Sequence, residues 1–322
     1  MPDLITSSDG SVEGRSAPPG VVAKGVRRTF GAVEAVRGIE LTARPGEVTA
    51  LVGPNGAGKT TLLLVLATLL VPDAGEVSVA GHDPVHAPDE VRARMGWAPD
   101  VFGLYDNLTA REYLQLFGEA YRLGRGRAAS RAGELLELSR LQEHADRPVH
   151  TLSRGQKQRL GLVRALVHDP EVLLLDEPAS GLDPRSRVEL RELLRALARS
   201  GTAVVVSSHL LGDLEELADR VVFVDRGTTV GEHALDQLPP GHALRPWRVR
   251  ALDTAALVAA LERNAYDFED PTPAGVDVLL ANDEAAAALL AGLVRDGVPV
   301  VSFQPLGGAL EAAYLSLTET GR

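Results

Sequence analysis

Nine consecutive residues near the start of the chain have the types and spacing that bind a phosphate chain. They are Gly53, Pro54, Asn55, Gly56, Ala57, Gly58, Lys59, Thr60 and Thr61, with four free positions between Gly53 and the Gly-Lys-Thr run. Glycines let backbone N–H groups turn onto phosphate oxygens because no Cβ blocks the approach. Lys59 adds an ammonium for the β- and γ-phosphates, and the Thr60 hydroxyl is placed to ligate Mg²⁺.

The context of this loop decides between two interpretations. Residues 48–52 are apolar and β-prone, and residues 62–71 have the composition of a helix. The alternative is a glycine-rich turn that merely caps a buried helix. A strand, a glycine loop and a helix in this order are the setting of a phosphate loop, and the helix dipole favours the anion. We therefore expect a nucleoside triphosphate to bind here.

A second group of candidate residues follows an apolar run at 172–175. Asp176 and Glu177 end this run, which is typical of a strand buried on both faces of a parallel sheet. Acids at the carboxyl end of such a strand lie where ligands bind open α/β sheets. Asp176 would hold Mg²⁺ through water and Glu177 would polarise an attacking water. The alternative is that both are surface loop acids.

Capping residues mark two helix starts in the middle of the chain. Ser153 and Gln156 form a capping box, with Ser as N-cap and Gln three positions on. Asp183 is the N-cap of another helix, and Pro184 takes its first position. Capping alone explains both pairs and requires no ligand.

Two single residues are candidates because of their position in the chain. His209 follows a second buried strand at 202–206, at the same predicted sheet edge as Glu177, where a γ-phosphate would lie. Phe30 precedes the loop, and an aromatic ring near a nucleotide can stack on the base. A lone His is usually structural and a lone Phe usually belongs to the core.

Length and composition limit the class of protein. The 322 residues suggest about two domains, and a net charge of −11 argues against nucleic acid as a partner. The chain has no cysteine, so it has no disulfide framework and no thiolate metal site. The most apolar run, 62–71, is about half the ~20 residues that span a bilayer. Any membrane role must therefore come through a partner.

We expect three regions along the chain. Residues 1–20, rich in Ser, Gly, Pro and acid, form a disordered leader. Residues 21–240 form an α/β domain, with a small antiparallel sheet at 21–52 and a helical insert at 101–168. Residues 241–322 form a small α+β domain, with strands at 247–251, 275–281 and 298–303 and helices at 254–263, 283–296 and 308–318.

Residues 21–240 resemble the nucleotide-binding domain of ABC transporters. The phosphate loop, Leu-Ser-Arg-Gly-Gln at 152–156, Leu-Leu-Leu-Asp-Glu-Pro at 173–178, Ser-Gly-Leu-Asp at 180–183 and His209 occur in the order and spacing of that family. The resemblance implies a P-loop NTPase fold that binds ATP and Mg²⁺. It implies that Phe30 stacks on adenine, that Asp176 belongs to the metal shell, and that Glu177 is the catalytic base. Lys59 and His209 would then contact the γ-phosphate.

The resemblance also implies a second copy of the chain. In the family, the helix N-terminus at Ser153, Gly155 and Gln156 meets the γ-phosphate bound by the other subunit, and the loop containing Asp183 crosses the interface. Two residues depart from the family pattern. Asp100 stands where Gln is usual, and a carboxylate there can still serve Mg²⁺. Arg154 replaces a Gly and adds a cation near the interface.

The function implied is that of the ATP-hydrolysing subunit of an ABC transporter, docked on a separate integral-membrane permease at the cytoplasmic face of the membrane. The ending at 307–315 is similar to the tail of ATPases that serve exporters of the ABC type-2 branch. An importer ATPase and a soluble ABC ATPase that remodels a protein complex are the alternatives. The transported substrate has no signal in these motifs, because substrate contacts would lie in the permease.

Overall fold

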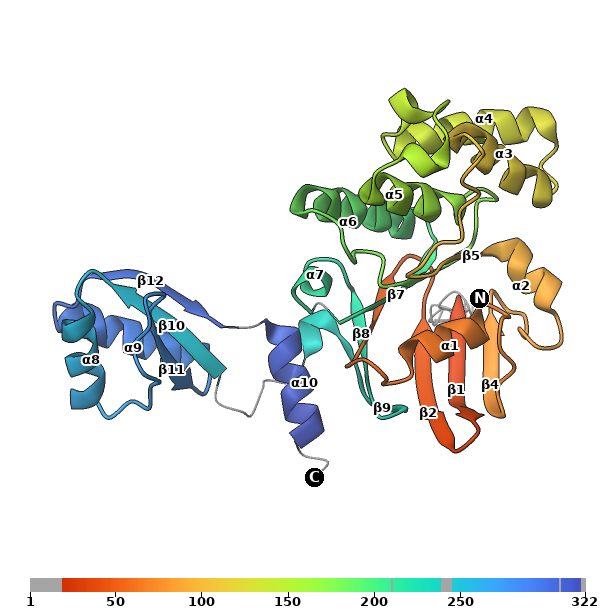
Figure 1. Ribbon diagram of the computed structural model, residues 1–322. Helices are drawn as coiled ribbons and strands as arrows, with labels where there is room; N and C mark the ends of the chain where they lie inside the picture. Colours follow the sequence, from red (N-terminus) through yellow and green to blue (C-terminus); the bar gives the residue numbers. More distant parts are fainter. Residues whose placement is uncertain (1–18, 210, 239–244, 307, 320–322) are drawn as a thin grey trace, which may run out of the picture.

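Nine strands form one sheet in the larger part of the molecule (Figure 1). The computed structural model describes residues 19–209, 211–238, 245–306 and 308–319. In spatial order the strands are β4 (Ala74–Val79), β1 (Val21–Phe30), β2 (Val33–Ala43), β9 (Thr228–Ala234), β8 (Arg220–Asp225), β3 (Val48–Val52), β7 (Ala203–Ser208), β6 (Val172–Asp176) and β5 (Met95–Ala98). Of the predicted leader, residues 1–18 lie outside the described residues.

The sheet has an antiparallel and a parallel part. Strands β1 and β2 pair antiparallel, as expected for the region ahead of the phosphate loop, but their third partner is β4, which follows the loop. The predicted sheet at 21–52 is wrong for β3, which belongs to the parallel part because it pairs with β7 and β8. Strands β8, β3, β7, β6 and β5 pair parallel. A single residue pair, Gly38 with Thr228, joins β2 to β9, and β9 pairs antiparallel with β8. The predicted small sheet is therefore continuous with the large one.

Helices cover both faces of the parallel part. Helix α1 (Lys59–Leu66) packs in one apolar cluster with β1, β2 and alternate residues of β6 and β7, such as Leu174 and Val205. Helices α5 (Arg154–Arg164) and α6 (Pro184–Arg199) pack in the other cluster, with Leu173 and Val204. Because successive residues of a strand point to opposite faces, burial on both sides requires the continuous apolar run seen in the sequence.

The helical insert stands at one end of the sheet (Figure 1). It contains α3 (Ala110–Ala120) and α4 (Arg125–Leu138), which follow α2 (Pro88–Arg94) and β5. The side chains of Tyr113 and Leu114 on α3 and of Leu135 and Leu136 on α4 are fully buried between these helices. The helical period predicted for this segment is confirmed, and its buried side chains belong to one apolar cluster with Leu173 and Val204 of the sheet. Helix α5, inside the predicted insert at 101–168, packs in the same cluster on the face of the sheet.

The second unit has its own sheet and core. Strand β10 (Arg245–Ala251) pairs antiparallel with β11 (Val276–Leu280) and β12 (Val300–Pro305), and α8 (Thr254–Arg263) and α9 (Asp283–Arg295) pack against them. All five elements were predicted, with ends that differ by at most two residues. Residues 239–244, where the predicted domain boundary falls, lie outside the described residues.

The last helix, α10 (Ala309–Glu319), departs from the predicted division because it packs on the first domain (Figure 1). Leu310 and Ala313 join the apolar cluster of the large domain, and the Tyr314 ring centroid lies 6.1 Å from that of Phe223. The Leu310 N–H donates to Glu215 Oε1 at 2.6 Å, at the end of α7 (Leu211–Glu215). Among the described residues, no helix has the length and apolar character to cross a membrane.

Candidate functional site

The phosphate loop connects β3 to α1 at the carboxyl edge of the parallel sheet. Strand β3 is buried along its whole length between β7 and β8. Gly58, the N-cap of α1, has φ +102°, and a Cβ there would lie 2.7 Å from the Ala35 carbonyl oxygen. A Cβ on Gly53 would lie 2.1 Å from the Val224 carbonyl oxygen. Both glycines are required by the close approach of neighbouring backbone, a reason additional to the approach of phosphate that the motif predicts.

Lys59 is held inside the loop that it follows. Its side chain is buried, and Nζ donates to the carbonyl oxygens of Gly53 at 2.6 Å and Pro54 at 3.1 Å. Burial lowers the pKa of the ammonium, and the nearby carboxylates of Glu177 and Asp176 act in the opposite direction. The cation is thus positioned by two backbone carbonyls of the phosphate loop.

Thr60 and Asp176 meet at the same edge, as predicted. The Thr60 hydroxyl donates to Asp176 Oδ2 at 2.8 Å, and the Ser207 hydroxyl donates to the other carboxylate oxygen. Asp176 is only 4% exposed, so the two hydroxyls satisfy a carboxylate that would otherwise be buried without partners. Hydroxyl and carboxylate oxygens are hard ligands that suit Mg²⁺.

Glu177 and His209 form a direct contact. His209 Nδ1 lies 2.9 Å from Glu177 Oε2, although the two residues are 32 positions apart. Glu177 has φ +48°, a left-handed conformation that is unfavourable for a non-glycine residue. Its N–H donates to the carbonyl and hydroxyl oxygens of Ser207, both at 3.1 Å. Strain of this kind is common where a side chain is aimed at a reacting group.

Ser207 is a site residue that the sequence analysis missed. It bonds both acids, through the Asp176 carboxylate and the Glu177 amide. A signal was present, since Ser207 ends a buried strand at the predicted ligand edge. It was overlooked because a strand-end serine is common and carries no motif.

A cavity of 840 Å³ opens in front of this edge. Its walls include six loop residues, Asn55, Gly56, Gly58, Lys59, Thr60 and Thr61, together with Asp100, Asp176 and Glu177. Asp100 therefore lies at the wall of the same cavity as Thr60 and Asp176, and its place in the metal shell stays a prediction. Two arginines that no motif signalled, Arg37 and Arg226, also line it and add two cations to its walls.

The residues present fit a magnesium ion that bound phosphate completes. Among the described residues, no group of three or more His, Cys, Asp or Glu side chains is close enough to enclose a metal. Mg²⁺ commonly takes only one or two carboxylates and finds its other ligands in water and substrate phosphates. Thr60 and Asp176 supply such an incomplete set.

Phe30 is outside the walls of this cavity. It ends β1 and is 46% exposed, so it is not part of the core, which was the alternative for it. The guanidinium carbon of Arg28 lies 5.0 Å from its ring centroid. Stacking of Phe30 on a base stays a prediction.

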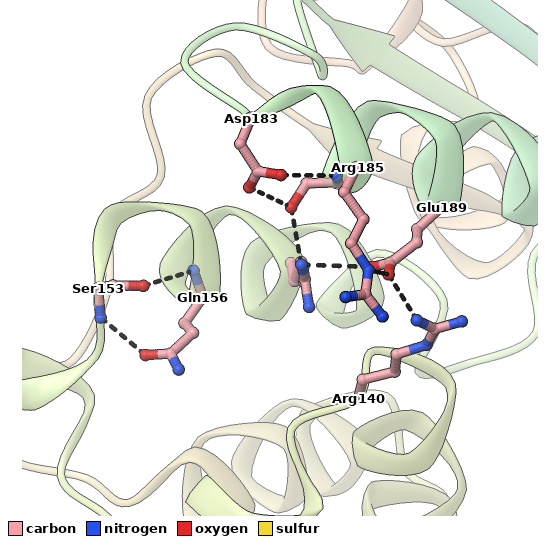
Figure 2. Close-up of polar contacts among 8 residues, drawn as sticks. Arg140, Ser153, Gln156, Asp183, Arg185 and Glu189 are labelled. Carbon is pink, nitrogen blue, oxygen red and sulfur yellow. Dashed lines mark hydrogen bonds and ion pairs between the residues drawn. The ribbon is translucent and has the colours of Figure 1, made fainter.

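The two capped helix starts have the predicted geometry (Figure 2). The Ser153 N–H donates to Gln156 Oε1 at 2.8 Å, and the Gln156 N–H donates to Ser153 Oγ at 3.3 Å. At α6, the Ser186 N–H donates to Asp183 Oδ1 at 3.1 Å. Of the residues described there, none of Ser153, Gly155, Gln156 and Asp183 lines the 840 Å³ cavity. One chain therefore does not bring these residues to its own phosphate loop.

Arg154, the first residue of α5, lies over the loop that leads to Asp183. Gly181 in that loop has φ +71°, and a Cβ there would lie 2.8 Å from the guanidinium carbon of Arg154. Gly155 faces the same loop, since a Cβ on it would lie 4.0 Å from Leu182 Cδ2. The starts of α5 and α6 are thus packed against each other.

The sequence of this chain is similar to those of known proteins. The sequence profile of the ABC transporter family matches residues 36–180. The daunorubicin resistance ATP-binding protein DrrA3 of Streptomyces coeruleorubidus is 41% identical over 222 residues, which are 69% of this chain and 70% of that protein. The daunorubicin/doxorubicin resistance ATP-binding protein DrrA of Streptomyces peucetius is 33% identical over 299 residues, 91% of each chain.

A solved structure agrees with the large domain. It is a dimeric ATP-binding cassette in a post-hydrolysis state with ADP and Pi bound. The two sequences are 28% identical, and the match covers 67% of this chain and 98% of that chain. The superposition has a TM-score of 0.61. The loop, the strand-end acids and these relatives together show that the chain belongs to the ABC transporter ATP-binding proteins.

Proposed function

We infer that this chain is the ATP-hydrolysing subunit of an exporter, working as a pair of identical copies on a separate integral-membrane permease. The observation that carries the proposal is the division of the site. Lys59, Thr60, Asp176 and Glu177 gather around one cavity, whereas Ser153 and Asp183 lie outside it. A second copy, placed head to tail, would bring its own helix starts to this cavity and close it over ATP.

Each residue of the cavity has a distinct role in this proposal. The N–H groups of the loop and the Lys59 ammonium bind the β- and γ-phosphates. Thr60 and Asp176, with Asp100 at the cavity wall, would hold Mg²⁺, which neutralises charge on the phosphate oxygens. Phe30 would stack on adenine at the open end of β1.

Hydrolysis requires a group that orients and deprotonates water. Glu177 is the candidate because its carboxylate borders the cavity and its backbone is fixed by Ser207. His209 Nδ1, at 2.9 Å from Glu177 Oε2, limits the positions that this carboxylate can take. His209 is also exposed toward solvent, where it can meet a γ-phosphate once the site closes.

Transport in the outward direction is supported by the relatives and by the C-terminal unit. Both curated relatives are named for resistance to daunorubicin, an outcome that export of the drug produces. The Streptomyces peucetius protein matches over 91% of this chain, so its similarity extends beyond the ATPase domain. The permease would hold this chain at the cytoplasmic face of the membrane.

The loop before α3 is the surface that we assign to the permease. Tyr105 is 56% exposed, and its ring centroid lies 6.3 Å from that of Tyr113, which belongs to the core of the insert. Val101 in the same loop is 80% exposed. Exposed aromatic and apolar side chains that are anchored to a rigid core are favoured at the centre of an interface.

The variant Glu177→Gln tests the proposal. It keeps the size of the side chain and removes the base, so we expect turnover to fall by about 10²-fold or more while ATP still binds. ATP should then accumulate the closed pair, which size-exclusion chromatography with light scattering detects as a dimer. Lys59→Ala in the same background is the control, since it should abolish the shift. Wild-type turnover in Glu177→Gln would refute the role of this residue.

A further inference from the structure

Helices α5 and α6, whose N-caps are Ser153 and Asp183, touch at their starts but leave a space between them further along. A cavity of 280 Å³ lies between α4, α5, α6 and the loop after β5. Its apolar walls include Leu162 and Val163 of α5 and Leu190 and Leu193 of α6. Apolar contact therefore does not by itself set the spacing of the two helices here.

A chain of hydrogen bonds crosses from α5 to α6 beside this cavity (Figure 2). Arg159 Nη2 of α5 donates to Ser186 Oγ at 2.7 Å. The same hydroxyl donates to Asp183 Oδ2 at 2.6 Å. A hydroxyl has one proton to donate, so a guanidinium on one side and a carboxylate on the other use it in one orientation only.

Glu189, one turn further along α6, contacts the same guanidinium nitrogen of Arg159 as Ser186 does. Its Oε2 lies 3.3 Å from Arg159 Nη2, and its Oε1 accepts from Arg140 and from Arg185. The Glu189 side chain is 19% exposed, while Arg140 and Arg185 are largely exposed. Arg140 follows α4, so the helical insert is tied to the same carboxylate (Figure 2).

The chain of hydrogen bonds ends at the carboxylate of Asp183. The side-chain hydrogen bond from Ser186 is the largest cause that lowers the pKa of Asp183. Hydrogen bonds with an ionised partner are shorter and stronger than neutral ones. The Asp183 side chain is therefore directed by Ser186, and Ser186 is directed by Arg159.

We propose that Arg159, held by Glu189 and bonded to Ser186, is a positioning residue that makes the start of α5 and the Asp183 loop move as one unit onto the partner subunit. The inference rests on the proposed function, because both segments lie outside the chain's own ATP cavity. The contact of Arg154 with Gly181 joins the same two segments at their exposed ends. Arg159 joins them at the buried end, where Ser186 is only 3% exposed.

The test uses the full chain with Glu177→Gln, in which ATP-induced dimers accumulate. Ser186→Ala, Arg159→Lys and the double variant are compared with the parent. Ser200→Ala is the matched control, since that hydroxyl lies at the other end of α6 and bonds only Leu197 O among the contacts described for it. The ATP concentration for half-maximal dimer is measured by light scattering, and ATP affinity of the dilute monomer by a fluorescent analogue.

We expect each single variant to raise the half-maximal ATP concentration about tenfold, and the double variant to raise it no further, because both changes cut one chain of bonds. Monomer affinity for ATP should not change, and Ser200→Ala should match the parent.

Two results would overturn the inference. One is a Ser186→Ala protein that dimerises like the parent. The other is a double variant whose shift is the product of the two single shifts, near a hundredfold, which indicates two independent effects. If the parent itself does not dimerise with ATP, the proposed function fails first and the inference fails with it.

Discussion

The phosphate edge, formed by Lys59, Thr60, Asp176 and Glu177, and the helix-start edge, formed by Ser153 and Asp183, differ in how far one chain completes them. At the phosphate edge Lys59, Asp176 and Glu177 are mostly buried, Thr60 is exposed, and each of the four side chains bonds another part of the same chain. At the helix-start edge the caps are satisfied, but the residues are exposed and lie outside the walls of the ATP cavity. Under the proposed function, the first edge binds the nucleotide and the second meets the partner copy.

Because the two edges differ in this way, mutations at each should affect different measurements. A change at the phosphate edge should alter ATP binding or chemistry within one chain. A change at the helix-start edge should leave ATP binding by the monomer intact and act only when two copies meet. Three substitutions test this distinction.

The largest effect is expected for Lys59→Ala. The buried ammonium is the counter-charge of the loop, and charge-assisted hydrogen bonds of this kind are worth about 1.5–3 kcal/mol. ATP affinity of the monomer should fall by about tenfold to a hundredfold, as measured by equilibrium binding. Unchanged affinity would remove Lys59 from the phosphate edge.

An intermediate effect is expected for Ser153→Ala. Loss of the cap costs about 1 kcal/mol, which lowers the melting temperature by roughly 2–4 °C in a domain of this size. ATP affinity of the monomer should stay at the wild-type value while turnover falls. A lower affinity of the monomer for ATP would contradict this division of the site, because it would place Ser153 at the chain's own ATP.

The smallest effect is expected for Asp100→Asn. Asp100 is exposed at the wall of the ATP cavity, where removal of one negative charge weakens attraction for Mg²⁺ while the amide oxygen can still coordinate. The Mg²⁺ concentration for half-maximal ATPase activity should rise by a few fold. Glu34→Gln is the control, because Glu34 lines the same cavity from β2. An identical Mg²⁺ titration would place Asp100 outside the metal shell.

The sequence predicted those parts of the site whose residues are close together in the chain. The phosphate loop, the capping box at Ser153, the N-cap at Asp183 and the strand-end acids are local patterns, and the structure has both caps with the expected hydrogen bonds. Buried parallel strands at β6 and β7 were expected from their apolar runs, whereas the order of the strands in the sheet was not predicted. The large domain and the elements of the C-terminal unit were therefore accessible without coordinates.

Contacts between distant residues were not accessible in the same way. Ser207 bonds Asp176 across 31 positions, and Arg159 bonds Ser186 across 27, with no spacing that marks either pair. The position of α10 is a similar case, since its apolar face could cover either domain. Its contacts with Phe223 and Glu215 put it on the first.

The phosphate loop, the strand-end acids and the helix caps could thus be predicted from the sequence alone, because such motifs depend on residue types at short fixed spacing. Only the tertiary structure decided which side chains share a cavity and which face outward. That decision depends on how strands and helices pack, and packing is set by the sum of many apolar contacts rather than by any one motif.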